Sequence, residues 1–398
     1  MYLCAMNLFG EEFFEQEQPT AQAVSYTRDL WRDRLIAQDE LLSKLQSAHR
    51  LDRIPHCSLF SGSRGSGQLI AALHLAQTIL CTEDKAPCGV CDACHRVSQL
   101  THPDLHFSYP TLGSSSLARD VSDQWRESVH QNPWMDISIW VSRQDKEAKQ
   151  ANITAAECRA IIEKLSMKPF MGEKTVLILW LPEFLGKEGN ILLKLLEEPA
   201  IGSYIILATN DQNAILPTII SRSQLFLLKP IEPSKAVLFL QQQHQLSALE
   251  AHSIFLAADG NMSLSVQWAK EGKFQFLELT KSLFQKAYVA EPIGMLEWID
   301  QFSQLDKEKQ FSLFQFVSQM LSLCIRAKNN IVESGVSENE MIGYVLKLSA
   351  GLNWLQIEQI NDLLDDATMA IKRNANIKIF MLDWMIQYSK CLRQKNEN

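Results

Sequence analysis

The chain has 398 residues, too many for one compact core, so two or three domains are expected. With 46% hydrophobic and 21% charged residues it has the composition of a globular protein, and no apolar run reaches the roughly 20 residues of a membrane-spanning helix. The formal net charge of -8 argues against a protein that grips nucleic acid over its whole surface. The start of the chain does not have the pattern of a secretory signal, so we expect a cytoplasmic protein with no membrane partner.

The first third of the chain begins with an acidic stretch and then acquires regular patterns. Residues 1–25 have no sustained period, which predicts a mobile N-terminal extension. A helical pattern covers residues 35–45, and a short apolar run at 57–61 leads through a glycine-rich segment into a second helical pattern at 69–80. Strand, glycine loop and helix in this order open a phosphate-loop α/β unit.

The middle of the chain alternates between strand and helix patterns. Residues 108–152 are polar and irregular, and we interpret them as a loop-rich insertion. The segments that follow are a helix at 154–165, a strand at 175–180, a helix at 188–196 and strands at 204–208 and 225–228. This alternation predicts a mostly parallel sheet. After Pro230 and Pro233 the strand patterns end, and the rest of the chain carries amphipathic helical patterns whose apolar stripes predict helix packing.

The glycine loop keeps the shape of a phosphate-binding loop without its chemistry. In the working motif G-x-x-x-x-G-K-[ST], backbone N–H groups cradle the phosphates, the Lys reaches the β and γ phosphates, and the hydroxyl binds Mg²⁺. Gly62 and Gly67 hold the two glycine positions, but Gln68 stands at the Lys position and Leu69 at the hydroxyl position. Gln carries no charge to offset phosphates, and Leu cannot bind a metal ion.

A second requirement for ATP hydrolysis is an acidic pair at the end of the next central strand. In the strand predicted at 175–180, the expected acidic positions are Trp180 and Leu181. Glu183 comes two residues too late to replace them without a change of register. These two losses predict that the chain does not hydrolyse ATP.

Four cysteines form the most specific cluster in the sequence. Cys81, Cys88, Cys91 and Cys94 follow the pattern C-x6-C-x2-C-x2-C. Thiolates at such spacing can close a tetrahedral, structural zinc site, with His95 as a nearby alternative ligand. The alternatives are an iron–sulfur cluster or scattered buried thiols, and zinc is favoured over both.

Several segments together resemble the clamp-loader subunits of bacterial DNA polymerase III, a family that includes gamma/tau and delta-prime subunits. The resemblance covers residues 30–230 and rests on the cysteine cluster and on the segments Arg53–His56, Leu59–Gly62, His102–Asp104, Asn190–Pro199 and Pro217–Ser223. Gamma-type subunits keep the Lys, the hydroxyl and the acidic pair, whereas delta-prime subunits often lose them, so this chain resembles the delta-prime type.

The resemblance also implies roles for single residues. The family's serine–arginine–cysteine motif matches Ser221, Arg222 and Ser223, with a departure at the third position. Arg222 would then be an arginine finger that reaches the γ-phosphate bound by a neighbouring subunit. The family's first sensor position matches Thr209 or Asn210, and its later sensor arginine falls near Ser263.

The resemblance implies an α/β fold, with a degenerate phosphate-loop AAA+ domain, a parallel sheet and a zinc insert, followed by a helical lid and a C-terminal helical collar. The expected boundaries are 1–25 for the extension, 26–231 for the AAA+ domain with its insert at 81–95, 232–285 for the lid and 286–398 for the collar. The implied partners are gamma/tau and delta subunits, the sliding clamp, and primer-template DNA through the assembled complex. ATP would be bound at neighbouring subunits only.

Two other functions remain alternatives. An ATP-hydrolysing motor subunit of the gamma/tau type would need Lys at position 68, where this chain has Gln. A zinc-dependent DNA-binding module would need a basic, aromatic-interleaved stretch around the cysteines, which the sequence does not have there.

Overall fold

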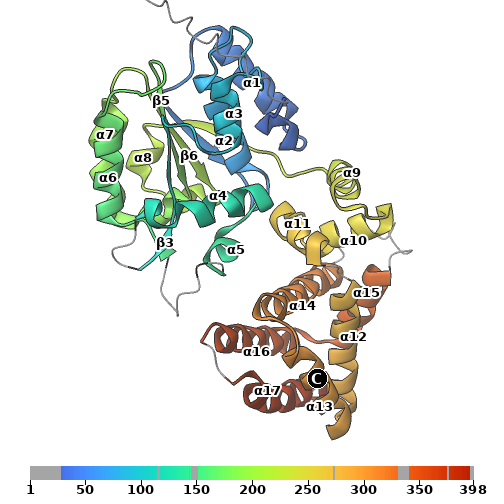
Figure 1. Ribbon diagram of the computed structural model, residues 1–398. Coiled ribbons are helices and arrows are strands. Elements are labelled where there is room, and N and C mark those ends of the chain that lie inside the picture. Colours follow the sequence, from blue (N-terminus) through green and yellow to red (C-terminus); the bar gives the residue numbers. More distant parts are fainter. Residues whose placement is uncertain are drawn as a thin grey trace, which may run out of the picture.

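The computed structural model describes residues 28–113, 117–142, 144, 151–271, 274–329, 340–373 and 376–394. Figure 1 shows an α/β domain, a group of short helices and a helical bundle that follow one another along the chain. The extension predicted at residues 1–25 lies outside the described residues.

A five-stranded parallel sheet forms the centre of the α/β domain. Its strands are β1 (Cys57–Ser61), β2 (Leu105–Ser108), β5 (Thr175–Trp180), β6 (Ser203–Thr209) and β7 (Gln224–Leu227). Their order across the sheet is β2-β5-β6-β1-β7, and every neighbouring pair is parallel. The predicted α/β fold with a parallel sheet is therefore confirmed, and β1 with its glycine loop lies between two other strands.

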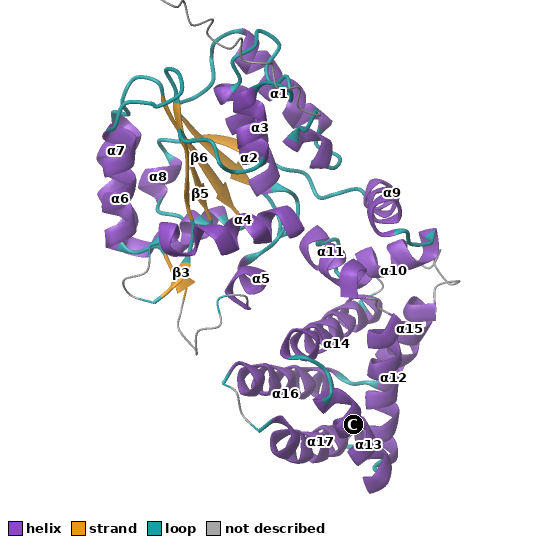
Figure 2. Ribbon diagram, viewed as in Figure 1, coloured by secondary structure: helices purple, strands orange, loops and turns teal. Residues whose placement is uncertain are grey.

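Both faces of the sheet are covered by helices (Figure 2). Phe60, Ile178 and Ile206 pack with the helix α2 (Gln68–Leu80) on one face. Their sequence neighbours Leu59 and Leu177 pack on the opposite face against α6 (Ala155–Ser166) and α7 (Leu193–Glu197). Side chains of successive residues in a strand point to opposite faces of the sheet. A strand in which consecutive residues are all apolar is therefore buried on both faces.

Outside the segment 108–152, the described part of the domain has six further helices. They are η1 (Trp31–Arg34), α1 (Asp39–Arg50), α3 (Asp92–Ser98), η3 (Pro182–Leu192), η4 (Gln212–Ala214) and α8 (Pro217–Ile220). The helix predicted at 188–196 is thus split between the 3-10 helix η3 and α7. Elsewhere capping side chains define the helix starts, as where Thr154 accepts a hydrogen bond from the Glu157 N–H at the beginning of α6.

The prediction of a loop-rich insertion at residues 108–152 is wrong for the described part of that segment. It contains β3 (Thr111–Leu112), η2 (Ala118–Val121), α4 (Ser122–Gln131), α5 (Ile137–Ser142) and β4 (Ala151–Asn152), and β3 pairs with β4. Trp125 and Trp140 are almost fully buried and pack edge to face, with ring centroids 5.3 Å apart. This segment is anchored in the core by a few large aromatic side chains. They are separated by polar residues without a regular period, so a prediction from hydrophobic periodicity does not detect the helices that carry them.

After β7, all the regular secondary structure within the described residues is helical. A first group consists of α9 (Pro233–His244), α10 (Ala248–Ala257) and α11 (Met262–Glu271). The bundle that follows consists of α12 (Phe274–Val289), α13 (Pro292–Ser303), α14 (Lys307–Lys328), α15 (Glu340–Gly351), α16 (Trp354–Lys372) and α17 (Ile377–Arg393). The predicted domain boundaries at 232 and 286 stay predictions.

The short helices α9–α11 contribute to two hydrophobic cores. Phe255 and Met262 belong to the core of the α/β domain, whereas Ile254 and Trp268 belong to the core of the bundle. The three parts are therefore linked by continuous apolar packing. Within the described residues, the structure contains no helix with the length and apolar character that crossing a membrane requires.

The aromatic cluster of the inserted segment gives a test of the fold. Trp125 contacts Tyr109, Trp140 and Trp180, so Trp125→Ala should leave a cavity and lower the free energy of unfolding by about 3–5 kcal/mol. Denaturant unfolding of the purified chain measures this loss. Trp354→Ala, at a half-exposed tryptophan of α16, serves as the control and should cost about 1 kcal/mol or less. Equal losses in the two variants would contradict the assignment of Trp125 to the core.

Candidate functional site

The glycine loop joins the end of β1 to the start of α2. Gly67 precedes the first residue of α2 and has φ 98°, and Gly65 has φ 75°, so both occupy the left-handed region that favours glycine. Gly62 follows β1 directly. The sequence thus folds into the strand–loop–helix unit that the glycine spacing predicts.

The side chain of Gln68 is hydrogen-bonded to the backbone of this loop. Its Nε2 donates to the carbonyl oxygen of Gly62 at 2.6 Å and to that of Ser63 at 2.8 Å, and the residue is only 5% exposed. Two backbone carbonyls of the loop are therefore engaged by a neutral amide of the chain itself. The next residue, Leu69, is buried in the hydrophobic core and offers no metal ligand.

Residues from the start of α11 lie against the same loop. A Cβ placed on Gly65 would stand 2.6 Å from the backbone nitrogen of Met262 and would collide with the Asn261 side chain. Asn261 is held in this place because its Oδ1 accepts a hydrogen bond from the Ser263 N–H at 2.9 Å. The Asn132 side chain of the inserted segment donates to the carbonyl oxygen of Ser263 at 2.9 Å. Ser263, the position expected for the later sensor, is fully buried at this junction.

The positions expected for the acidic pair have structural roles. Trp180 is buried and its ring lies 4.8 Å from that of Trp125, centroid to centroid. Leu181 is buried with φ 57°. Neither residue offers an oxygen to a metal ion.

Glu183 connects the ends of β5 and β6. It accepts a hydrogen bond from the Thr209 hydroxyl at 2.7 Å and one from the Asn210 N–H at 3.2 Å. Burial raises the pKa of this carboxyl group above its usual range. The predicted sensor residues Thr209 and Asn210 thus lie beside Glu183, a connection that the sequence analysis missed because the two strands are joined only in space.

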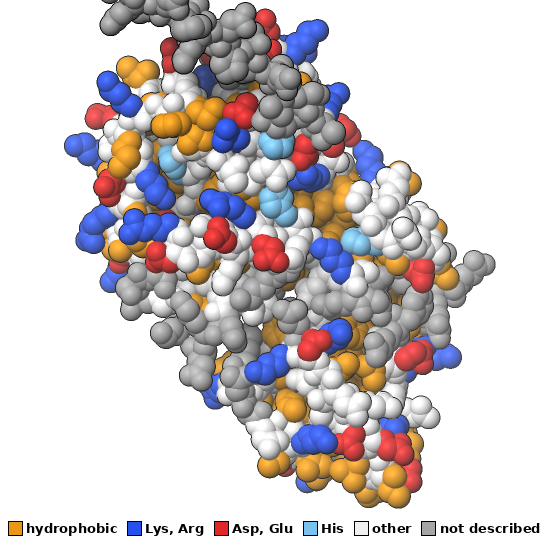
Figure 3. Space-filling model, viewed as in Figure 1, with side chains coloured by type: hydrophobic (Ala, Val, Ile, Leu, Met, Phe, Trp, Pro, Cys, Tyr) orange, Lys and Arg blue, Asp and Glu red, His pale blue; other side chains and the backbone are white. Residues whose placement is uncertain are grey.

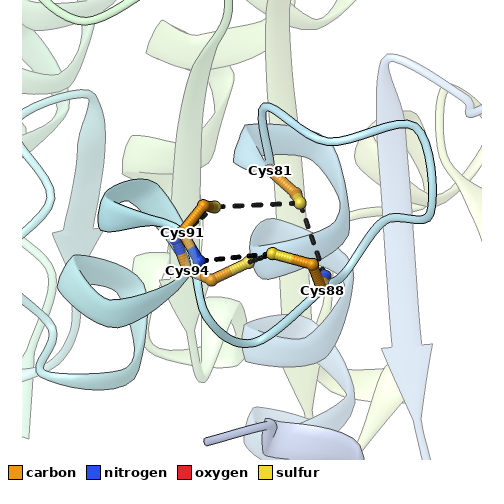
Figure 4. Close-up of side chains that lie close together, drawn as sticks. All are labelled: Cys81, Cys88, Cys91 and Cys94. Atoms are coloured by element: carbon orange, nitrogen blue, oxygen red, sulfur yellow. Dashed lines mark hydrogen bonds between the residues drawn. The ribbon is translucent and has the colours of Figure 1, made fainter. Parts of the chain in front are cut away.

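The four predicted cysteines come together in one cluster (Figure 4). Their sulfur atoms all lie within 4.8 Å of one another, with Cys81 and Cys91 at 4.0 Å and Cys88 and Cys94 at 3.9 Å. The group comprises these four residues and does not include His95. The remaining described cysteines are buried at separate places in the chain. The cluster could therefore bind a metal ion, as the spacing predicts.

Two helices and a turn hold the cysteines. Cys81 directly follows α2 and Cys91 directly precedes α3, while Gly89, with φ 77°, turns the chain between them. Gln77 of α2 fixes the start of α3 because its Nε2 donates to the carbonyl oxygen of Cys94 at 3.1 Å. The site is therefore attached to the same helix that follows the glycine loop.

Backbone N–H groups of the turn point at the sulfur atoms. The N–H of Cys88 donates to Cys81 Sγ at 3.4 Å, and the N–H of Cys91 donates to Cys88 Sγ at 3.3 Å. A hydrogen bond from Cys94 lowers the pKa of Cys81 to about 5, and the same contact raises the pKa of Cys94 well above its usual range. A metal ion bound between these sulfur atoms would displace the proton that Cys94 shares with Cys81.

Arg222 lies at the surface, between the end of α8 and the start of β7. Its Nε donates to Glu197 Oε1 at 2.8 Å, and one of its terminal nitrogens also contacts Oε1. The other terminal nitrogen donates to the carbonyl oxygen of Thr218 at 2.8 Å. The Arg222 side chain is 32% exposed and that of Glu197 is 48% exposed. The sequence predicted the arginine but not its partner, because Glu197 is 25 positions away along the chain.

Comparison with known proteins agrees with these features. Residues 37–232 match the family model described as DNA polymerase III, delta subunit. The delta-prime subunit of Bacillus subtilis is 28% identical over 205 residues, which are 51% of this chain and 51% of that protein. The delta-prime subunit of Haemophilus influenzae is 24% identical over 287 residues, covering 69% of this chain and 72% of that protein. The chain thus spans about half the length of the Bacillus relative.

A tau subunit and two solved structures are also similar to this chain. The tau subunit of Escherichia coli is 27% identical over 215 residues, 53% of this chain and 26% of that protein. Among solved structures, a gamma-subunit-related protein of Thermotoga maritima covers 83% of this chain and 98% of its own, with 17% identity and a TM-score of 0.35. The Bacillus subtilis clamp loader delta protein covers 88% and 99%, with 12% identity and a TM-score of 0.34.

The fold and the sites define an AAA+-like α/β protein with a four-cysteine insert and helical C-terminal parts. Its phosphate loop has no lysine. Within that class, residues 37–232 belong to the family of DNA polymerase III delta-prime subunits.

The contact between the loop and α11 gives a prediction. Gly65→Ala adds a methyl group to a left-handed backbone and into Asn261, so it should lower the free energy of unfolding by roughly 2–4 kcal/mol. Hydrogen exchange at residues 261–266 should rise as well. The matched control is Gly172→Ala, since Gly172 has φ 110° but nothing within 4 Å of the new methyl group, and it should cost only about 1–2 kcal/mol. Equal effects on exchange at 261–266 would rule out the packing of α11 on the loop.

Proposed function

We propose that this chain is a clamp-loader subunit of the delta-prime type that does not hydrolyse ATP and that donates Arg222 to the ATP site of a neighbouring subunit. Gln68 is the main support for the proposed lack of ATP hydrolysis. Its amide occupies the position of the lysine and is hydrogen-bonded within the loop. The absence of a metal ligand at Leu69, Trp180 and Leu181 supports it independently.

The register of the strands supports the second half of the proposal, that Arg222 acts on a neighbouring subunit. β7 pairs with β1 in parallel, with Ser58 opposite Gln224, so Arg222 comes just before the start of β7. The glycine loop follows the opposite end of β1. Five strand residues at about 3.3 Å each separate the two ends by about 16 Å, which is beyond the reach of an arginine side chain. Arg222 therefore cannot serve the loop of its own chain.

The contact with Glu197 suits a residue that must change partners. An exposed ion pair contributes only about 0–1 kcal/mol, so the guanidinium can leave Glu197 for a phosphate at small cost. Until then, Glu197 and the Thr218 carbonyl hold it at the surface in one orientation. Glu197 acts here as a positioning residue.

The proposal places the chain in a cytoplasmic ring with gamma/tau and delta subunits. ATP would bind at the neighbours, and the assembled complex would open the sliding clamp and place it on primer-template DNA. This chain would contribute one half of one ATP site and a fixed structural element.

For the cysteine cluster we propose one structural zinc ion. A tetrahedral site with Zn–S bonds of about 2.3 Å has sulfur–sulfur distances of about 3.8 Å, close to the 3.9 and 4.0 Å found here. An iron–sulfur cluster distributes its cysteines over several iron atoms and needs sulfurs further apart. Four sulfurs fill the coordination sphere, so the ion would hold the turn between α2 and α3 rather than perform chemistry.

The first test concerns ATP. The purified chain should release no phosphate from Mg-ATP above background, and Gln68→Lys alone should not create activity because no residue would hold the metal ion. Steady-state phosphate release measures both. Turnover in the ordinary enzyme range that is lost in Gly67→Val would refute the proposal.

The second test concerns the metal. We expect one zinc per wild-type chain and none in Cys91→Ser, whose residues 81–95 should become sensitive to protease while the rest stays folded. Elemental analysis and limited proteolysis measure these outcomes. Cys324→Ala, at a buried cysteine of the bundle, is the control and should keep its zinc. Iron with visible absorption bands, or no metal in the wild type, would decide against zinc.

The third test concerns Arg222. Arg222→Ala should assemble normally but lower the DNA-stimulated ATPase of the reconstituted complex, since an arginine finger accelerates its own site by roughly 10³-fold or more. The loss for the whole ring should be smaller, because the other sites keep their own residues. Arg222→Lys should rescue poorly, as an ammonium group lacks the planar fork.

Two further variants make this test specific. Glu197→Gln keeps a side-chain oxygen that can accept from Arg222 and should therefore retain most of the activity, and Arg50→Ala, at an exposed arginine of α1, should behave as wild type. Unchanged ATPase of a correctly assembled Arg222→Ala complex would remove Arg222 from the mechanism. Failure of that variant to assemble would make it a packing residue.

A further inference from the structure

Two turns at the end of the sheet where the strands begin present exposed apolar side chains. The first turn joins α6 to β5 and exposes Met167 and Phe170, and the second joins α7 to β6 and exposes Ile201. Phe170 is 83% exposed and Ile201 is fully exposed. We call these three residues the strand-start patch. In Figure 3, hydrophobic side chains lie among charged ones at this end of the α/β domain, which is uppermost in Figure 1.

A buried carboxylate holds the first turn in place. Asp104, which directly precedes β2, is 3% exposed, and its two carboxylate oxygens accept the N–H groups of Phe170 at 2.5 Å and Met171 at 2.6 Å. Hydrogen bonds to a charged acceptor are stronger than those between neutral groups. Asp104 thus fixes the backbone that carries the exposed Phe170 ring. The segment His102–Asp104, part of the resemblance to clamp-loader subunits, supplies this carboxylate.

The second turn lies directly against the first. Gly202 has φ 80°, and a Cβ at this position would collide with the carbonyl oxygen of Glu173. The Thr175 N–H donates to the Gly202 carbonyl oxygen at 2.9 Å, and the Ser203 N–H donates to that of Ala200 at 2.9 Å. Both turns are therefore fixed by hydrogen bonds to their backbone. A backbone that is already ordered loses little further freedom when a partner covers it.

Charges of both signs surround the strand-start patch. Lys168 and Glu173 on the first turn are exposed, and so is Glu198 at the start of the second. Apolar and aromatic residues within a polar rim of mixed charge are the composition of a protein–protein interface. A nucleic-acid strand would instead require clustered cations. The patch therefore suits a folded protein as its partner.

The strand-start patch lies at the same end of the sheet as Arg222. Glu197, which accepts from Arg222 Nε at 2.8 Å, precedes Ile201 in the same connection between α7 and β6. Neighbouring strands are about 4.8 Å apart, so Ile201 beside β6 is about 10 Å and Phe170 beside β2 about 19 Å from the line of β7. An interface of about 800 Å² per partner is roughly 30 Å across. A protein that brings a phosphate to Arg222 can therefore cover the whole patch.

We propose that the strand-start patch contacts the subunit whose ATP site receives Arg222, and that Asp104 positions Phe170 for this contact. The proposal rests on the function proposed above, since the occupant of the patch is the partner of Arg222. That partner offers an apolar recess to the Phe170 ring and the Ile201 side chain. A few anchors of this kind supply most of the binding energy of an interface. The patch then fixes the orientation in which Arg222 meets the phosphate of its neighbour.

The experiment is a calorimetric titration of the full chain into the gamma/tau subunit of the same organism, with ATP present. Phe170→Ser should weaken binding at least about tenfold, and Ile201→Ser about threefold to tenfold, which are ordinary losses for interface anchors. Leu227→Ser is the matched control, because Leu227 is 65% exposed in the same sheet but ends its strand. It should bind like the wild type. Circular dichroism should show wild-type melting for all three variants, since each replaces an exposed side chain.

A double-mutant cycle tests the positioning role of Asp104. Asp104→Asn leaves one acceptor oxygen for the two N–H groups, so hydrogen exchange at residues 170 and 171 should rise and binding should weaken. In a chain that already carries Phe170→Ser, the same substitution should cause no further loss of binding, because Asp104 acts through Phe170. Additive losses would instead remove Asp104 from the proposal and leave it a purely structural residue.

Three results would overturn the contact itself. They are wild-type affinity of both Phe170→Ser and Ile201→Ser, an equal loss in Leu227→Ser, or self-association of the chain alone that Phe170→Ser abolishes, which would assign the patch to a second copy. These results would leave the proposed function intact. Conversely, unchanged ATPase in Arg222→Ala together with weak binding of Phe170→Ser would refute the arginine finger and retain the contact. A wild-type chain that does not bind the gamma/tau subunit would contradict both proposals.

Discussion

The hydrogen bonds of Gln68 are the constraint on which the nucleotide loop and its surroundings depend. In an ordinary ATPase a charged lysine stands at this position of the loop and contacts the phosphates. Here a neutral amide binds the Gly62 and Ser63 carbonyls in a buried place, at a gain of about 1 kcal/mol for each bond. A lysine at the same buried position, without a phosphate, would instead carry the cost of an unpaired charge. The two carbonyls are therefore held by a side chain of the protein itself.

The loop, held by the Gln68 hydrogen bonds, is also packed against other parts of the chain. Asn261 and Met262 lie against Gly65, and Asn132 of the inserted segment is hydrogen-bonded to Ser263. From there, α10 and α11 contribute side chains to the core of the α/β domain and to the core of the bundle. These contacts connect the glycine loop to both hydrophobic cores.

Regular patterns in the sequence allowed the sheet, the glycine loop and the cysteine cluster to be predicted, because each depends on residues close together in the chain. The strands at 57–61 and 175–180 are found where the apolar runs predict them. The segment at 108–152 was misjudged, since α4 has only Trp125 and Val129 as large apolar residues and is buried through contacts with distant rings. The pairs Glu183–Thr209 and Arg222–Glu197 could not be predicted either, as each joins two elements that meet only in the folded protein.

The two halves of an ATP site have separate physical requirements, so the function we propose, in which one half is lost and the other kept, needs no change in the rest of the fold. Binding phosphates needs a charged side chain, a hydroxyl and acidic groups at the ends of β1 and β5, all of which are replaced here by Gln68, Leu69 and Trp180. Presenting an arginine needs only α8, the Glu197 carboxylate and the Thr218 carbonyl, at the other end of the sheet. Replacements in the loop core therefore leave the Arg222 surface unaltered. A chain of this kind can lose its own nucleotide chemistry and still offer an arginine to a neighbour.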